Sequence, residues 1–136
     1  LSWWQAAAAA QGVVEPWTVR LTAPRHLLHQ RILARTEAMR ERGLLKEVAT
    51  ALAEGAPLVG PGMDGIGVRE AVAVLQGRLP EELMVSAIAT ATRQYAKRQE
   101  TWFRHQLRGD VLVLDATRPP EQLAATIAAA WERPTA

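Results

Sequence analysis

This 136-residue sequence contains basic residues at helical spacing, a pattern that could bind a polyanion. At about 100° per residue, four of them fall in one narrow stripe: Arg93, Lys97, Arg104 and Arg108. Each phosphate that such a stripe neutralises releases counterions, so the pattern suits a nucleic-acid backbone. Glu100 interrupts the stripe, and Arg98 and Gln99 border it, where they could reach bases. A basic face that is only solvated is the alternative.

A second pair of cations, Arg31 and Arg35, stands four residues apart and therefore shares one helix face. Two guanidinium groups in register could clamp an anion. Glu37 and Glu41 are close enough in sequence to neutralise them instead. The sequence leaves both interpretations open.

Other kinds of site are excluded or not supported. Cysteine is absent, which excludes disulfide scaffolds, thiolate zinc sites and thiol nucleophiles. Residues 55–62 have the glycine spacing of a P-loop but lack the Lys and the Ser or Thr that should follow, and no strand precedes them. His26 and His29 have no Glu between them in a zinc-protease pattern. Ser2 and Ser86 have no recognisable triad partners. We therefore expect no metal site and no catalytic nucleophile here.

The elements that must position the two basic groups are bounded by Gly and Pro. We expect helices over residues 2–11, 24–42, 44–54, 68–76, 80–107 and 121–132, strands over 17–21 and 111–114, and a flexible loop over 55–67. In the longest helix, the side of the helix opposite the basic stripe should pack on the body of the protein through Met84, Val85, Ile88, Tyr95, Trp102 and Phe103.

Composition is that of one globular domain or part of a larger one. Hydrophobic residues make up 49% and charged residues 22%, with a mean hydropathy of −0.07. No apolar run approaches the roughly 20 residues that cross a bilayer, and no secretory leader is recognisable. The net charge is +2, with 14 Arg against 2 Lys. A GC-rich genome would raise Arg and Ala together, so this ratio alone does not establish anion binding.

The two expected strands predict an incomplete sheet, because about ninety mostly helical residues separate them and small sheets usually need three or more strands. The wholly apolar run 111–114 indicates a strand buried on both faces of a parallel sheet. Either two copies pair by their sheets, or the remaining strands belong to sequence outside these residues, which we favour. The fold class is α/β and predominantly helical.

One long string carries a resemblance to a known family. Residues 92–104, Thr-Arg-Gln-Tyr-Ala-Lys-Arg-Gln-Glu-Thr-Trp-Phe-Arg, closely resemble the signature helix of bacterial tRNA dimethylallyltransferases, also called tRNA isopentenyltransferases. Residues 28–48, 65–70 and 110–115 resemble the family's preceding helix pair, its glycine turn and its last strand, in that order. The sequence departs from the family at Val68, where Tyr is common, and at Gly65, where Ala is frequent.

The resemblance implies a fold and an activity. It implies that residues 1–16 end a helical insertion and that 17–136 form the C-terminal part of a P-loop NTPase-like, nucleotide-binding core. These enzymes transfer a dimethylallyl group from dimethylallyl diphosphate to N6 of the adenosine 3′ to the anticodon. Their phosphate cradle, Mg²⁺-binding hydroxyl and catalytic Asp belong to an N-terminal half whose motifs do not occur in these 136 residues. We therefore expect no catalysis by this chain alone, and expect the whole enzyme to be cytoplasmic, monomeric and not membrane-bound.

The resemblance also implies roles for individual residues. Arg35, and less directly Arg31, would contact the diphosphate. The anticodon stem-loop of tRNA would contact two segments, first Arg93, Lys97, Arg98, Gln99, Thr101, Trp102 and Arg104, and second Asp64, Gly65, Ile66, Gly67, Val68 and Arg69. A non-enzymatic helical RNA-binding module that shares only the basic helix is the main alternative, and a structural or oligomerisation domain is the third.

Overall fold

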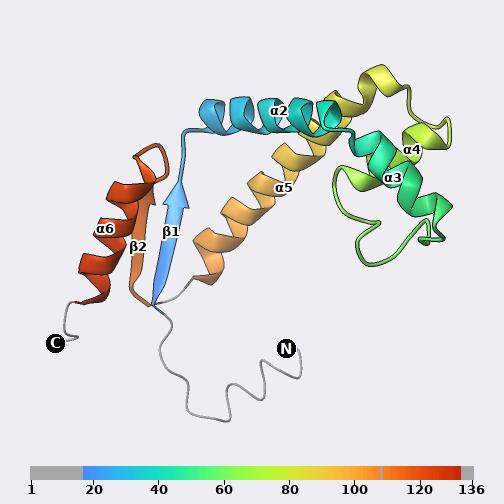
Figure 1. The fold of residues 1–136 in the computed structure, drawn as a ribbon. Helices are drawn as coiled ribbons and strands as arrows, with labels where there is room; N and C mark the ends of the chain where they lie inside the picture. Colours follow the sequence, from blue (N-terminus) through green and yellow to red (C-terminus); the bar gives the residue numbers. More distant parts are fainter. Residues whose placement is uncertain (1–16, 108, 133–136) are drawn as a thin grey trace, which may run out of the picture. The chain divides into compact units, whose positions relative to one another are not determined.

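The computed structural model describes residues 17–107 and 109–132, which form helices and two strands (Figure 1). The elements in chain order are β1 (Thr18–Thr22), α2 (Arg25–Glu41), α3 (Leu44–Ala53), α4 (Val68–Leu75), the 3₁₀ turn η1 (Glu81–Leu83), α5 (Met84–Gln106), β2 (Val111–Asp115) and α6 (Pro120–Trp131). The strands and helices predicted in this part of the chain are confirmed. The helix expected over residues 2–11 lies outside the described residues.

Pro and Gly set the boundaries of α2 and α3, as the sequence predicts. Pro24 is extended (φ −55°, ψ 137°) and precedes the first residue of α2, where its fixed φ suits a helix start. Gly43 has a φ of 97°, a conformation that residues with a Cβ rarely adopt, and it turns the chain from α2 into α3. One long apolar pattern is therefore divided into two helices.

The described residues divide into two compact units, one formed by 17–23 with 102–107 and 109–132, and the other by 24–101. In the first, which we call the strand unit, β1 and β2 pair in parallel, from Thr18 with Val111 to Thr22 with Asp115. The rings of Trp17 and Trp131 meet edge to face with centroids 5.5 Å apart, which joins the start of β1 to the end of α6.

The described residues alone do not bury 111–114 on both faces, as the prediction of an incomplete sheet requires. Leu114 is buried, but Val113 is 55% exposed, as is Leu21 on β1. The sheet of the described residues has two strands, so each strand has one edge without a neighbour. Such a pair lacks the three or more strands that usually give a sheet independent stability.

The second unit, which we call the helical unit, has an apolar core where α3, α4 and the start of α5 meet. Its buried members are Leu44, Val48, Ala71, Val72, Met84 and Ile88. Met84 and Ala71 are fully inaccessible, and Ile66 and Met39 pack against the cluster from outside. This core therefore fixes α2, the turn before α4 and the first half of α5 in relation to one another.

The prediction for the apolar side of α5 is confirmed near its start and wrong further along. Met84 and Ile88 are buried, whereas Tyr95 is 49% and Trp102 56% exposed. Helix α5 has 23 residues, while α3 and α4 have 10 and 8, so these shorter helices cover only its first turns. Among the described helices, none is both long and apolar enough to cross a membrane.

Candidate anion and nucleic-acid site

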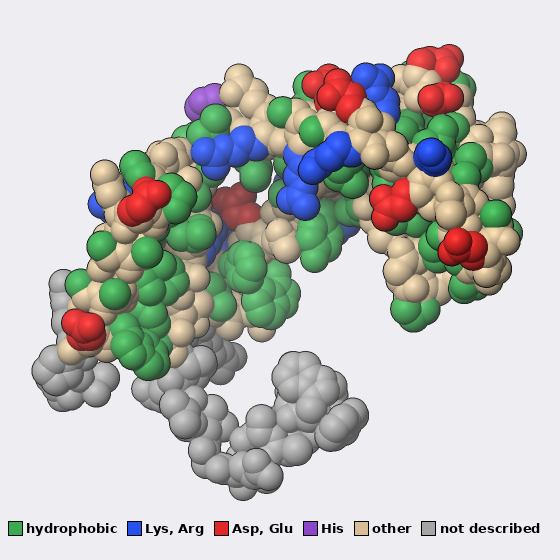
Figure 2. Space-filling model, viewed as in Figure 1, with side chains coloured by type: hydrophobic (Ala, Val, Ile, Leu, Met, Phe, Trp, Pro, Cys, Tyr) green, Lys and Arg blue, Asp and Glu red, His purple; other side chains and the backbone are tan. Residues whose placement is uncertain are grey.

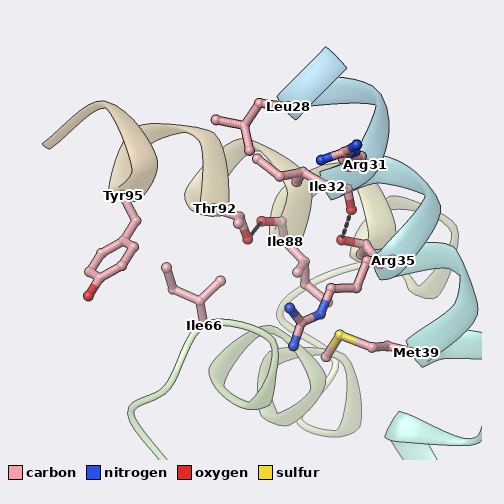
Figure 3. Close-up of a pocket in the computed structure, with 10 residues that line it drawn as sticks. Leu28, Arg31, Ile32, Arg35, Met39, Ile66, Ile88, Thr92 and Tyr95 are labelled. Atoms are coloured by element: carbon pink, nitrogen blue, oxygen red, sulfur yellow. Dashed lines mark hydrogen bonds between the residues drawn. The ribbon is translucent and has the colours of Figure 1, made fainter. Parts of the chain in front are cut away.

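A groove of about 520 Å³ lies within the helical unit, between α2 on one side and α5 with the turn before α4 on the other (Figure 3). We call it the α2–α5 groove. Its lining residues are Leu28, Arg31, Ile32, Arg35, Thr36, Met39, Ile66, Ile88, Thr92 and Tyr95. Most are apolar, and the two arginines are the only charged side chains among them.

Helix periodicity explains how α2 contributes to this groove. Residues 28, 31, 32, 35 and 39 recur at three- and four-residue steps and so share one face. The hydroxyl of Thr36 donates a hydrogen bond to the carbonyl of Ile32, and that of Thr92 donates to Ile88, both at 2.8 Å (Figure 3). These hydroxyl protons are satisfied inside their own helices, which leaves the two guanidinium groups as the strong donors of the groove.

Arg31 and Arg35 are exposed, and neither forms an ion pair or a side-chain hydrogen bond with any described residue. The alternative that Glu37 and Glu41 neutralise them is therefore wrong. Side chains meet across a helix at spacings of three and four, and the residue four after Arg35 is Met39. Figure 3 shows Arg35 extending from α2 over the groove, and Figure 2 shows Lys and Arg side chains gathered along this helix. The pair is thus open to an anionic ligand.

The turn at residues 64–69 forms part of the opposite wall and contributes Ile66. Asp64 Oδ2 accepts a hydrogen bond from the Gly60 amide at 3.0 Å, which closes the preceding loop. Gly67 has a φ of 100°, and a Cβ there would lie 3.4 Å from Met39 Cε. Gly65 next to Ile66 has an ordinary φ, so of these two glycines only Gly67 is required by the backbone.

Glu70 is a residue of this turn that our sequence reasoning missed. Its Oε2 accepts the Gly67 amide at 2.7 Å, and its Oε1 accepts Arg69 Nε at 2.8 Å. A Glu three residues after the start of a helix, reaching back to the first amide, is half of a capping box, and this spacing could have identified it. Val68, which replaces the family's usual Tyr, is half-buried against the helical core.

The basic face of α5 is exposed in the helical unit. Arg93, Lys97 and Arg98 have no carboxylate partner among the described residues, and Arg93 donates to Thr90 Oγ1 at 3.0 Å. Gln99 and Thr101 are also exposed, and Thr101 donates to the Lys97 carbonyl at 3.1 Å. Three predicted cations of this segment are therefore available to a polyanion.

The end of α5, which belongs to the strand unit, carries the remaining predicted residues. Arg104 is exposed, and Trp102 meets Phe103 edge to face with centroids 5.4 Å apart. Arg108 lies outside the described residues. Within residues 17–107 and 109–132, no three His, Asp or Glu side chains gather in a way that could hold a metal ion.

Comparison with known proteins places this architecture in one family. A sequence model of the IPP transferase family matches residues 1–106, and the chain belongs to that family. This confirms the resemblance found in the sequence. The chain is also similar to the tRNA dimethylallyltransferase of Rhizobium etli (strain CIAT 652), with 48% identity over 83 residues, and to that of Bartonella henselae, with 38% identity over 117 residues.

The fold is shared with a solved structure. The crystal structure of tRNA delta(2)-isopentenylpyrophosphate transferase from Staphylococcus epidermidis matches 96% of this chain with a TM-score of 0.77 and 27% identity. The matches cover 61% and 84% of this chain for the Rhizobium and Bartonella relatives. They span 28% and 40% of those two proteins, and 42% of the solved chain. The chain therefore corresponds to less than half the length of these relatives.

Proposed function

We propose that this chain forms the tRNA-binding and diphosphate-contacting part of a tRNA dimethylallyltransferase. The reaction is transfer of a dimethylallyl group from its diphosphate to N6 of the adenosine 3′ to the anticodon. A C–O bond to the diphosphate breaks, a C–N bond to N6 forms, and N6 loses a proton. Two arginines without acidic partners, facing an apolar groove, are the observation that carries the proposal.

In this proposal Arg35, assisted by Arg31, contacts the diphosphate. The leaving group gains negative charge as the C–O bond breaks, and a preplaced guanidinium stabilises that charge. Ile66, Met39 and Ile88 line the same groove and suit the apolar dimethylallyl chain. The chemistry of the groove thus matches both ends of a prenyl diphosphate.

The anticodon stem-loop is assigned to the exposed face of α5 and to the turn at residues 64–69. Arg93, Lys97, Arg98 and Arg104 hold backbone phosphates, while Gln99, Thr101 and Trp102 contact the nucleosides. Asp64, Gly65, Ile66, Gly67, Val68 and Arg69 form the second RNA-facing segment. Because Ile66 lines the groove, the turn joins the RNA-facing surface to the diphosphate site.

The remaining machinery is assigned to other parts of the enzyme. The described residues offer no cluster of three or more His, Asp or Glu side chains that could hold Mg²⁺. We propose that residues 17–136 form the C-terminal part of a P-loop NTPase-like core and that residues 1–16 are the end of a helical insertion. The rest of that core supplies the phosphate cradle and the catalytic Asp. Its substrate tRNA implies a cytoplasmic enzyme, and we propose that it acts as a monomer.

A chimera tests the proposal. In the Bartonella henselae transferase, the 117-residue matching segment is replaced by the aligned segment of this chain. The chimera should transfer dimethylallyl to tRNA. In it, Arg35→Ala should raise the apparent KM for dimethylallyl diphosphate or lower kcat by about tenfold or more, because a hydrogen bond to a charged group contributes roughly 1.5–3 kcal/mol. Arg40→Ala, an exposed change on α2 outside the groove, is the matched control.

The same assay separates the alternative of a non-enzymatic RNA-binding module. Such a module would bind the stem-loop through α5 without any effect of Arg35 on the diphosphate. A folded chimera with equal kinetics for wild type and Arg35→Ala would therefore refute the diphosphate assignment. Retained RNA binding together with no transfer by the folded chimera would favour the module.

A further inference from the structure

We propose that Glu70 is a positioning residue for RNA binding, which fixes the turn at residues 64–69 and aims the Arg69 guanidinium at an RNA phosphate. This inference rests on the proposed function and adds to it a residue with no direct contact to substrate. The carboxylate is nearly enclosed, since its side chain is 11% exposed, whereas that of Arg69 is 53% exposed. One partner is thus held inside the protein while the other reaches solvent.

Both oxygens of Glu70 are occupied by the turn. Oε2 accepts the Gly67 amide at 2.7 Å and Oε1 accepts Arg69 Nε at 2.8 Å. A buried carboxylate must be satisfied in this way, because an unpaired buried charge is strongly destabilising. With both oxygens engaged and the side chain enclosed, Glu70 acts on a ligand only through these two partners.

Arg69 keeps most of its donors for a ligand. A guanidinium has five N–H donors, and Glu70 takes the one on Nε. No other described residue bonds to the remaining four, which lie on the two Nη atoms. Holding Nε fixes the plane of the group, so less conformational entropy is lost when the Nη donors bind a phosphate.

The Gly67 bond connects this cation to the groove. Gly67 is buried and adopts the positive φ that this turn requires. Ile66, the residue before it, lines the α2–α5 groove. A single carboxylate therefore sets both the wall of the groove and the direction of Arg69. The turn at residues 64–69, which is proposed to contact RNA, is thus held in a fixed position beside the proposed diphosphate site.

The test uses the sign of an electrostatic effect. Removing a negative charge from a protein that binds a polyanion should strengthen binding by simple attraction. We expect Glu70→Gln to do the opposite and weaken binding of an anticodon stem-loop RNA by about three- to eightfold near 0.1 M salt, because most of one phosphate contact is lost. The amide oxygen of Gln still accepts from Gly67, while its NH₂ group opposes Arg69 Nε. Glu47→Gln, an exposed carboxylate on α3, is the control and should leave binding unchanged or slightly stronger.

A double-mutant cycle in the full 136-residue chain decides whether Glu70 acts through Arg69. We expect Arg69→Met to weaken binding at least as much as Glu70→Gln, and the double variant to be no weaker than Arg69→Met. Additive losses would show a merely structural role and overturn the inference, as would tighter or unchanged binding by Glu70→Gln. If Glu70→Gln is unfolded, as judged by loss of the helical far-UV circular dichroism signal, Arg69→Met alone decides. Unchanged RNA affinity of Arg69→Met would show that Arg69 makes no RNA contact for Glu70 to position, and would overturn the inference.

The two proposals fail in different ways. If the wild-type chain does not bind the stem-loop at all, the RNA-binding part of the proposed function and this inference are both refuted. If wild type binds and Lys97→Ala weakens it, but Glu70→Gln does not, only the positioning role is refuted.

Discussion

Replacement of Lys97 by Ala tests the basic face of α5 most directly. Lys97 is exposed and has no carboxylate partner among the described residues, so its full charge is available to a phosphate. Its neighbours four residues before and after are Arg93 and Thr101, of which the first is also basic. Removing Lys97 should therefore delete one phosphate contact without exposing a buried charge.

The magnitude follows from counterion release. One duplex phosphate contact contributes about −0.9 to the slope of log K against log salt concentration, so its loss should make the negative slope shallower by about 0.9. With 1 M salt as the reference at which the contact contributes nothing, the loss of affinity is about 15-fold at 50 mM salt and about 4-fold at 200 mM. The penalty should therefore shrink visibly as salt is added.

Fluorescence anisotropy with a labelled anticodon stem-loop RNA measures both quantities. Lys46→Ala is the matched control, because Lys46 is the only other lysine and lies exposed on α3. Equal slopes for Lys97→Ala and wild type would refute the reasoning, whatever the change in affinity at one salt concentration. A slope lowered equally by Lys46→Ala would show a general charge effect in place of a phosphate contact.

The remaining predictions concern stability and activity. Met84→Ala should cost about 2–5 kcal/mol in urea unfolding, since Met84 is fully buried in the helical core, and a cost below 1 kcal/mol would contradict that packing. Gly67→Ala should cost about 1–3 kcal/mol because its φ is 100°, while Gly65→Ala, with ordinary φ and its nearest contact at 3.7 Å, should be close to neutral. Equal costs for the two would contradict the backbone argument. The 136-residue chain alone should show no prenyl transfer to tRNA, and any turnover in that assay would overturn its assignment as a non-catalytic part.

The sequence was sufficient to predict the elements and the shared face of the two arginines. Gly43 and Pro24 mark helix boundaries because glycine readily adopts a positive φ and the proline ring restricts φ. The four-residue spacing of Arg31 and Arg35 places both side chains on the same helix face. Both are local properties. They do not depend on which other elements lie nearby, and for that reason they were predictable.

Burial was predicted less well because it depends on tertiary neighbours. The apolar pattern of α5 is continuous, yet Met84 is buried in the helical core while Tyr95 is 49% and Trp102 56% exposed. Val113 likewise belongs to an apolar strand, but its side chain lies on the opposite face of the sheet from the buried Leu114 and is 55% exposed. Periodicity gives the direction of a side chain and says nothing of what it meets.

The candidate site shows the same division. The cations were identified from the sequence, whereas the groove that brings Arg35 opposite Ile66 required the structure. Glu70 was missed because a glutamate in the first turn of a helix is ordinarily solvated and favoured there by the helix dipole. Its burial against Gly67 and Arg69 depends on the turn that precedes it.

The parallel pairing of β1 and β2 has a consequence for the order of folding. Thr22 and Leu114 are in contact although 92 residues separate them in the sequence. At about 5–20 residues per second, a ribosome needs roughly 5–18 seconds to synthesise such an interval. The β1–β2 pair can therefore form only after α2, α3, α4 and α5 have been synthesised, whereas those helices can assemble earlier through short-range contacts.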